Sequence, residues 1–358
     1  MNEKLHHIQI VFIVFMVQTG VTIFSLPRVV AESFGTNGWL AIVFVSAVVC
    51  ISLFLIYLVY KKGNGESVFV IWEKRIPKIL LLPIYVTMIV IMGVLAIMLT
   101  KVYSLLIKLM LFKEINTNIL VVLILISVLF FLSKGIYNVA KITTAFFFIT
   151  IFYIFVFPLL FPEFSFTRMT PFFFQGDINI WKGFVDIYKA FIGFCVALFI
   201  IPYVEKQTHF GKAIFFGHFL TTIAYLLVCI ISFGFFSFEQ MKQILYPVLM
   251  LLKYVQTPVI ERVENITFSV YILSIIVSVA FYYWISVQFL RRFFRNTSER
   301  RLTFIIVVIT FLLSLFFEKQ REIDFIMNIH IYPFMFMSFF LPIFTLFCIK
   351  LNKRVEKK

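Results

Sequence analysis

Residues 18–27 of the chain read QTGVTIFSLP, and they interrupt an apolar run that extends from about Ile8 to Ala31. The run is long enough to cross a bilayer as one helix, which needs about 20 apolar residues. Its middle nevertheless carries threonines, a glycine, a serine and a proline. Backbone groups in lipid must be paired, so non-helical backbone at membrane depth survives only where protein encloses it. The stretch therefore predicts a broken helix that lines an internal site, and a simple proline kink is the alternative.

The composition of the whole chain places it in a membrane. Of its 358 residues, 62% are hydrophobic and only 14% are charged, and the mean hydropathy is +1.03. A soluble domain is nearer half apolar. Strand-like alternation is absent from the sequence, which argues against an outer-membrane barrel. We therefore expect an all-α integral membrane protein.

Ten apolar runs are long enough to span the bilayer. They cover residues 8–33, 39–60, 79–107, 117–133, 142–161, 184–203, 214–236, 266–290, 302–317 and 331–349. Lys and Arg cluster after the second run, after the eighth run and at the C-terminus, and cytoplasmic loops carry such clusters. An even number of spans then places both termini in the cytoplasm.

The formal net charge of +15 comes from these short basic loops. We interpret it as a topology signal and as contact with anionic lipid head groups, and we expect no nucleic-acid partner. Cys50, Cys195, Cys229 and Cys348 lie in apolar runs without metal-ligand spacing. They predict free thiols, with no metal and no cofactor. The first run lacks a signal-peptidase pattern and is expected to stay in the mature protein.

Two long loops are expected on the outer side. Residues 162–183 are rich in aromatics and suggest an interfacial belt. Residues 238–265 predict two short helices that separate at Thr257-Pro258, and they form either a lid or a plain surface pair.

The interrupted first run predicts two half-helices, at about 8–19 and 26–34, with Gly20–Phe24 unwound between them. Gly20 permits departure from helical geometry, Ser25 is expected to cap the second half, and Pro27 suits its first turn. The carbonyl end of one half favours a cation, and the amide end of the other favours an anion. A zwitterionic amino acid offers both.

The sixth run, which contains Gly193 and Pro202, repeats this interruption. Breaks at corresponding positions of two halves point to an inverted repeat with a midplane binding site. We therefore expect one transmembrane domain over residues 1–358, built from a five-plus-five inverted repeat of about 8–161 and 184–349, with broken helices 1 and 6.

Three stretches carry a family resemblance. They are GVTIFSLPRVVAESFGTNGW from residue 20, GFCVALFIIPYVEK from residue 193, and ILYPVLMLLKYVQTPVIERVEN from residue 244. Together they resemble the B subunit of spore germinant receptors, a branch of the amino acid–polyamine–organocation transporter superfamily. The resemblance covers essentially the whole chain.

The resemblance implies a ligand pocket between spans 1, 3, 6 and 8, and a protein that senses a small-molecule nutrient, an amino acid or a sugar, in the spore inner membrane. It also implies two partners, a germinant receptor A subunit and a C-subunit lipoprotein. Position 195 is Cys where a polar pocket group is expected, which leaves the ligand chemistry open.

The candidate site residues follow from position in the broken helices and on neighbouring faces. The predicted ligand-binding residues are Thr19, Gly20, Val21, Thr22, Phe191, Gly193, Phe194, Cys195, Tyr271, Ser274, Ser278 and Met92, with Met88 and Leu95 as alternatives to Met92. Arg28 and Glu32, four residues apart, are predicted to gate the pocket. Each of these residues also has a purely structural explanation as the alternative to a role in the site. In that explanation the threonines bond to their own helix, the phenylalanines pack in the core, the serines hydrogen-bond to neighbouring helices, and the charged side chains at span ends extend to water.

Catalytic motifs are absent from the sequence, so we expect no enzyme activity. Asp, Glu, Lys and His are absent from the centres of the predicted spans, which favours a receptor, or a channel-like or facilitative role, over active uptake such as that of a proton-coupled pump. The alternative is a secondary amino acid transporter that works by alternating access, and a structural scaffold is a third, weaker reading.

Overall fold

The computed structural model describes residues 4–170, 176, 178–205, 209–255 and 262–355. Almost all of this backbone is helical. Among these residues, extended backbone pairs at a single bridge, between Leu5 and Val204. The fold is therefore all-α.

The helical elements follow one another with short connections. The first group is α1 (His7–Gln18), η1 (Val21–Phe24), α2 (Leu26–Phe34), η2 (Gly35–Asn37), α3 (Trp39–Lys62) and α4 (Val68–Glu73). The second is α5 (Lys78–Met110), α6 (Thr117–Leu132), α7 (Ile136–Thr150), α8 (Phe152–Val156), η3 (Phe157–Glu163) and η4 (Phe166–Met169). The third is α9 (Ile180–Ala190), α10 (Val196–Ile200), η5 (Ile201–Tyr203), α11 (Phe210–Phe235), α12 (Phe238–Gln243), α13 (Pro247–Lys253), α14 (Val263–Leu290), α15 (Glu299–Ser314) and α16 (Gln320–Val355).

Every predicted span coincides with one of these helices or with a chain of shorter ones. Five helices, α3, α5, α11, α14 and α16, are long and apolar enough to cross a membrane as single segments. The helices α1, α6 and α7 are apolar but shorter. The integral membrane class is confirmed, whereas the ten-span inverted repeat stays a prediction.

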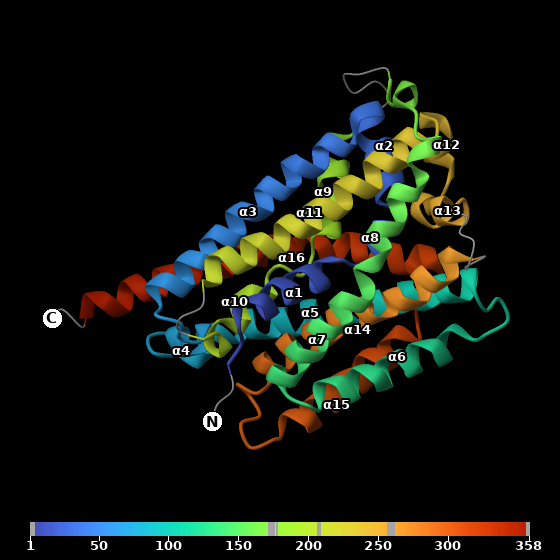
Figure 1. Cartoon of the computed structure of the whole chain (residues 1–358). Coiled ribbons are helices and arrows are strands. Elements are labelled where there is room, and N and C mark those ends of the chain that lie inside the picture. Colours follow the sequence, from blue (N-terminus) through green and yellow to red (C-terminus); the bar gives the residue numbers. More distant parts are fainter. Residues whose placement is uncertain (1–3, 171–175, 177, 206–208, 256–261, 356–358) are drawn as a thin grey trace.

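The core of the bundle surrounds α1 (Figure 1). Helix α1 packs against α11, α7 and α14, and α14 packs in turn along α5. Helix α14 is buried along most of its length, which an apolar helix achieves when neighbours surround it. Its small side chains, such as Ser274, Ser278 and Ala280, allow those neighbours to approach closely.

The two ends of the bundle carry different elements (Figure 1). The N-terminus, the C-terminus, α4 and α10 lie toward one end, while α2, α12 and α13 lie at the other. An even number of crossings puts both termini at one end, so this placement agrees with the predicted topology. The first end is called the termini end below, and the second the α2 end.

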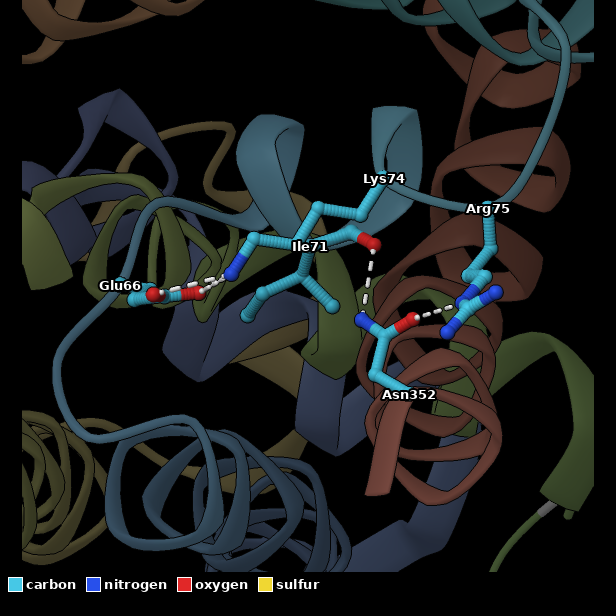
Figure 2. Close-up of polar contacts among 5 residues, drawn as sticks. All are labelled: Glu66, Ile71, Lys74, Arg75 and Asn352. Carbon is cyan, nitrogen blue, oxygen red and sulfur yellow. Dashed lines mark hydrogen bonds and ion pairs between the residues drawn. The ribbon is translucent and has the colours of Figure 1, made fainter. Parts of the chain in front are cut away.

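The C-terminal part of α16 fastens α4 at the termini end, as Figure 2 shows. The Asn352 side chain donates to the Ile71 carbonyl at 3.4 Å and accepts from Arg75 Nε at 3.2 Å. Lys74 Nζ pairs with Glu66 Oε2 at 2.8 Å within the same loop. The loop between the second and third predicted spans is therefore attached to the last helix.

Residues 238–265 contain two short helices, α12 and α13, but both lie before Thr257, so the first predicted helix is itself interrupted. They separate at residues 244–246, directly before Pro247, which lies in the first turn of α13. This is where proline is tolerated in a helix and where the residue before it leaves helical geometry. The predicted separation at Thr257-Pro258 lies outside the described residues.

Candidate functional site

The first helix is broken where its sequence predicts. Helix α1 ends at Gln18. Gly20 is extended, with φ −92° and ψ −177°, and the chain continues as the 3-10 turn η1 before α2 begins. Pro27 lies in the first turn of α2 as predicted. Ser25 precedes α2 but makes no side-chain cap, so the predicted capping is wrong; its hydroxyl donates back to the Thr22 carbonyl at 3.3 Å.

Hydroxyl groups from α14 satisfy the carbonyl oxygens that the break exposes. Tyr271 OH lies 2.9 Å from the carbonyl oxygens of both Thr19 and Gly20. Ser274 Oγ lies 3.1 Å from the Met16 carbonyl and 3.0 Å from that of Thr19. Ser278 Oγ also reaches the Met16 carbonyl, at 3.1 Å. Orphan carbonyls at a helix end need such partners, so this face of α14 holds the broken end of α1 in place.

Thr19 turns toward its own helix. Its hydroxyl donates to the Phe15 carbonyl at 2.9 Å and lies 3.2 Å from Ser274 Oγ. This geometry fits the structural explanation for Thr19, in which its hydroxyl bonds to its own helix, because a helical threonine commonly bonds the carbonyl four residues earlier.

The second break lies against the first. Residues 191–195 form a turn between α9 and α10, and Gly193 adopts φ +120°. A Cβ at Gly193 would lie 2.6 Å from the Val17 carbonyl oxygen. Glycine is required here both by the positive φ and by the close approach of the two backbones. At Gly20 neither condition holds, because φ is negative and a Cβ would meet nothing within 4 Å.

One tyrosine joins the two breaks. Tyr225 on α11 places its hydroxyl 2.7 Å from the carbonyl oxygen of Gln18, at the end of α1, and 2.7 Å from that of Ala190, at the end of α9. Both carbonyls belong to helix ends that lack a next turn to bond them. Tyr225 is not among the site residues predicted from the sequence.

A buried histidine belongs to the same junction. His218 on α11 is only 1% exposed. Its Nδ1 lies 3.2 Å from the Gln18 side chain, and its Nε2 lies 2.9 Å from Ser46 Oγ on α3. The Gln18 amide nitrogen in turn lies 3.5 Å from the Phe191 carbonyl. His218 lies nearer the start of α11 than its centre, so it does not contradict the expectation for the span centres, but it is an ionisable side chain buried inside the bundle.

The remaining predicted residues of the second break are packed among aromatic rings. The Phe191 ring lies 5.2 Å from the rings of both His218 and Tyr225, and the Phe194 ring lies 6.0 Å from that of Tyr188. Cys195 is buried beside them. Met92 is buried in α5, and its role in a pocket stays a prediction.

A cavity of about 320 Å³ opens beside the break, toward the α2 end. This volume suits a small ligand. Of the residues predicted to bind ligand, Val21 and Thr22 of η1 line it. The other lining residues come from α2 and the residue before it, from α5, α9 and α16, and from the turn before α13: Ser25, Val29, Leu99, Val102, Asp186, Lys189, Leu245, Tyr246, Gln320, Asp324, Met327 and Asn328. It is called the η1 cavity below.

Charged and amide groups line one side of the η1 cavity. Lys189 Nζ lies 2.5 Å from Asp186 Oδ1 on its own helix and 2.5 Å from Asn328 Oδ1 on α16. Asp324 accepts from the Gln320 amide at 2.9 Å. Two carboxylates and one ammonium thus leave the wall with one excess negative charge, which favours a ligand that carries an amino group.

Arg28 acts electrostatically on Tyr246, which lines this cavity, although neither Arg28 nor Glu32 is a lining residue. Arg28 Nε pairs with Glu32 Oε1 at 2.6 Å, and their side chains are 29% and 35% exposed. Burial raises the pKa of the Tyr246 phenol, Asp324 raises it further, and Arg28 lowers it. Tyr246 therefore lies close to both Asp324 and Arg28. Its neutral hydroxyl can donate and accept a hydrogen bond in the cavity.

Comparisons with known proteins agree on one family. The model for the family described as spore germination protein matches residues 4–323. The chain is 24% identical to spore germination protein GerQB of Bacillus cereus over 318 residues, which are 87% of this chain and 86% of that protein. It is 24% identical to spore germination protein B2 of Bacillus subtilis, over 74% of this chain and 72% of that one. It is 21% identical to spore germination protein A2 of Bacillus subtilis, over 99% and 98% respectively.

Proposed function

Because this chain belongs to the spore germination protein family, we propose that it is the nutrient-sensing membrane subunit of a spore germinant receptor. The observation that carries the proposal is the η1 cavity, which lies directly beside the broken first helix and has polar and charged walls. A small nutrient in this cavity contacts Val21 and Thr22 of η1. Helix breaks at a ligand site recur in membrane proteins that change shape on binding.

The ligand class follows from the chemistry of the wall. An amino acid places its ammonium group near Asp324 or Asp186 and its carboxylate near Lys189, and charge-assisted hydrogen bonds are the strong ones. A sugar would use the amides of Gln320 and Asn328 instead. The excess negative charge favours the amino acid.

The residues at the two breaks then act as a hinge. Thr19, Gly20, Tyr271, Ser274 and Ser278 hold the end of α1 through hydrogen bonds. Phe191, Gly193, Phe194 and Cys195 pack the second break against it. A ligand that moves η1 pulls on this hinge, and the hinge moves the second half-helices, α2 and α10. Coupling of this kind requires a ligand with unequal affinity for two arrangements.

The wider assembly is part of the same proposal. The subunit works in the spore inner membrane, with ten spans in two inverted repeats and both termini in the cytoplasm. It works with a germinant receptor A subunit and a C-subunit lipoprotein. The likeness to three spore germination proteins of two Bacillus species supports this context.

A secondary amino acid transporter is the second candidate. Two observations favour it: Arg28, which acts on the cavity residue Tyr246, pairs with Glu32, and serine hydroxyls converge with carbonyl oxygens at the end of α1. Oxygen clusters of that kind can hold a coupling cation in transporters.

The experiment reconstitutes the full chain in liposomes and exposes it to single amino acids and sugars. Thermal unfolding and radiolabelled uptake are measured under imposed sodium and proton gradients. A sensor is stabilised by its ligand, by about 2.7 kcal/mol at a ligand concentration of 100 Kd, and accumulates nothing. Gradient-driven accumulation would establish the transporter instead.

A matched pair of variants ties the response to the η1 cavity. Asp324→Asn removes a carboxylate from the wall and is expected to abolish stabilisation by an amino acid. Glu239→Gln removes a carboxylate from the surface of α12, where Glu239 pairs with Lys242 at 3.2 Å and is 71% exposed. If both variants respond like the unmodified protein, the ligand binds elsewhere.

A further inference from the structure

A second cavity, of about 450 Å³, lies among elements of the termini end. Its walls come from the start of α4, from α10 and η5, and from the end of α14 and the turn that follows it. Among the described residues, it shares no lining residue with the η1 cavity. Its polar lining residues are Ser67, Tyr203, Gln288, Arg291, Arg292 and Arg295. It is called the arginine cavity below.

The three guanidinium groups are held in place by the fold. The Arg292 guanidinium carbon lies 4.3 Å from the centre of the Phe69 ring, in a cation–π contact. Its side chain is 27% exposed. Arg291 and Arg295 flank it in the same turn after α14. A planar guanidinium fixed on a ring loses little freedom when it binds a further partner.

The carboxylates nearby do not balance this charge. Glu73 pairs with Arg292 at 3.7 Å and with Arg295 at 3.4 Å, and it also accepts from Tyr85 OH at 3.1 Å. Glu299 pairs with Arg291 at 3.2 Å. Three guanidinium groups thus meet two carboxylates, and each guanidinium carries five N–H donors. One positive charge and most of the donors are left for another ligand.

We propose that the arginine cavity binds a phosphate group, either the head group of an anionic lipid or a phosphate from solution. A phosphate carries a charge of about −1.5 to −2 and several acceptor oxygens, and it pairs with guanidinium groups in a bidentate geometry. Basic pockets between membrane helices near a bilayer surface bind phospholipid head groups.

Binding there would join three elements that are separate in the sequence: the start of α4, α10 with η5, and the end of α14. Helix α10 and turn η5 are the second half of the broken sixth span. The α4 loop is anchored to α16, where Trp72 Nε1 donates to Thr345 Oγ1 at 2.9 Å. A phosphate between the arginines of the α14 end and these neighbours would therefore stabilise the packed arrangement described here. The inference does not depend on what binds in the η1 cavity.

The test uses the full chain, purified in a neutral detergent without phosphate and also reconstituted in nanodiscs. In detergent, the midpoint of thermal unfolding is followed against inorganic phosphate, with chloride at equal ionic strength as the reference. In nanodiscs, phosphatidylcholine alone is compared with phosphatidylcholine containing one fifth phosphatidylglycerol. The double variant Arg291→Gln/Arg292→Gln is compared with Arg300→Gln/Arg301→Gln, which removes the same charge from the start of α15.

The expected result is that phosphate stabilises the unmodified protein in a saturable way. The Arg291→Gln/Arg292→Gln variant should need at least about 10-fold more phosphate for the same stabilisation, while the α15 variant should bind phosphate with the affinity of the unmodified protein. Stabilisation by phosphatidylglycerol but not by free phosphate identifies the lipid head group as the source, and the reverse identifies soluble phosphate. Equal stabilisation of both variants, or none for the unmodified protein in either medium, overturns the proposal. If the double variant does not fold, Arg295→Gln provides the same comparison, since that side chain is 58% exposed.

Discussion

Substituting alanine at the two glycines of the breaks tests whether the junction is as tightly packed as described. At Gly193 the added Cβ would lie 2.6 Å from the Val17 carbonyl oxygen, 2.8 Å from Val17 Cγ1 and 2.9 Å from the Val17 carbonyl carbon. Two of these atoms are backbone and cannot rotate away. At Gly20 a Cβ would meet nothing within 4 Å.

The magnitudes follow from packing and from φ. Forcing an extra carbon into a filled site costs about 1–3 kcal/mol, and holding a non-glycine residue at φ +120° adds about 1–3 kcal/mol. Gly193→Ala should therefore lower the free energy of unfolding by about 2–6 kcal/mol. Gly20→Ala has neither penalty and should change it by less than about 1 kcal/mol, with a small gain from a less flexible unfolded chain.

The assay is unfolding of the purified full chain, by heat and by titration with a denaturing detergent, for both variants and the unmodified protein side by side. Nutrient-triggered germination of spores that carry each variant gives the functional counterpart, and only Gly193→Ala should impair it. Equal stability of Gly193→Ala and the unmodified protein would refute the close approach of the two breaks. Strong destabilisation by Gly20→Ala would refute the open space assigned to that position.

Three further substitutions test the junction and the Arg28–Glu32 pair. Tyr271→Phe removes a hydroxyl that lies 2.9 Å from the Thr19 and Gly20 carbonyl oxygens, which keep the Ser274 hydroxyl and the Ile23 amide as donors. It should lower the free energy of unfolding by about 0.5–1.5 kcal/mol; thermal unfolding measures it, and an unchanged midpoint would contradict the hydrogen bonds. His218→Ala should lower the free energy of unfolding by at least as much, because it removes the imidazole that pairs with the Gln18 side chain and leaves a void. A double-mutant cycle with Gln18→Ala should show a coupling energy above about 0.5 kcal/mol. Arg28→Gln should change stability by only about 0–1 kcal/mol, since its pair with Glu32 is partly exposed, yet alter the nutrient response or uptake if the pair is a gate; an unaltered response would remove it from the mechanism.

Much of the architecture could be predicted because it depends on the residue types within short segments of the chain. The apolar runs require a bilayer, and their lengths place the helices. Gly20, Ser25 and Pro27 disturb a helix within a few residues, so the first break appeared at its expected position. The second break was also expected. Its Gly193 combines a positive φ with a close approach to the Val17 backbone, and each of these favours glycine.

The polar stripe on α14 illustrates a partial success. Tyr271, Ser274 and Ser278 share one helix face, and that periodicity alone predicts that they turn inward. The sequence left open whether they line a pocket or hold another helix. The structure places their hydroxyls on carbonyl oxygens of the broken α1, because a helix end in a bilayer has no water to bond it.

What only the tertiary structure decided is which distant side chains meet. Lys189 and Asn328 are 139 residues apart in the chain, and Gln18 and His218 are 200 apart. No local pattern connects such pairs, because their contact depends on the relative rotation and depth of whole helices. Hydrophobic length and helix-breaking residues are properties of short segments, and the sequence by itself determined them: a membrane protein with two broken helices. The polar wall of the η1 cavity and the arginine cavity arise from packing, since each takes its residues from segments that fold together only in three dimensions.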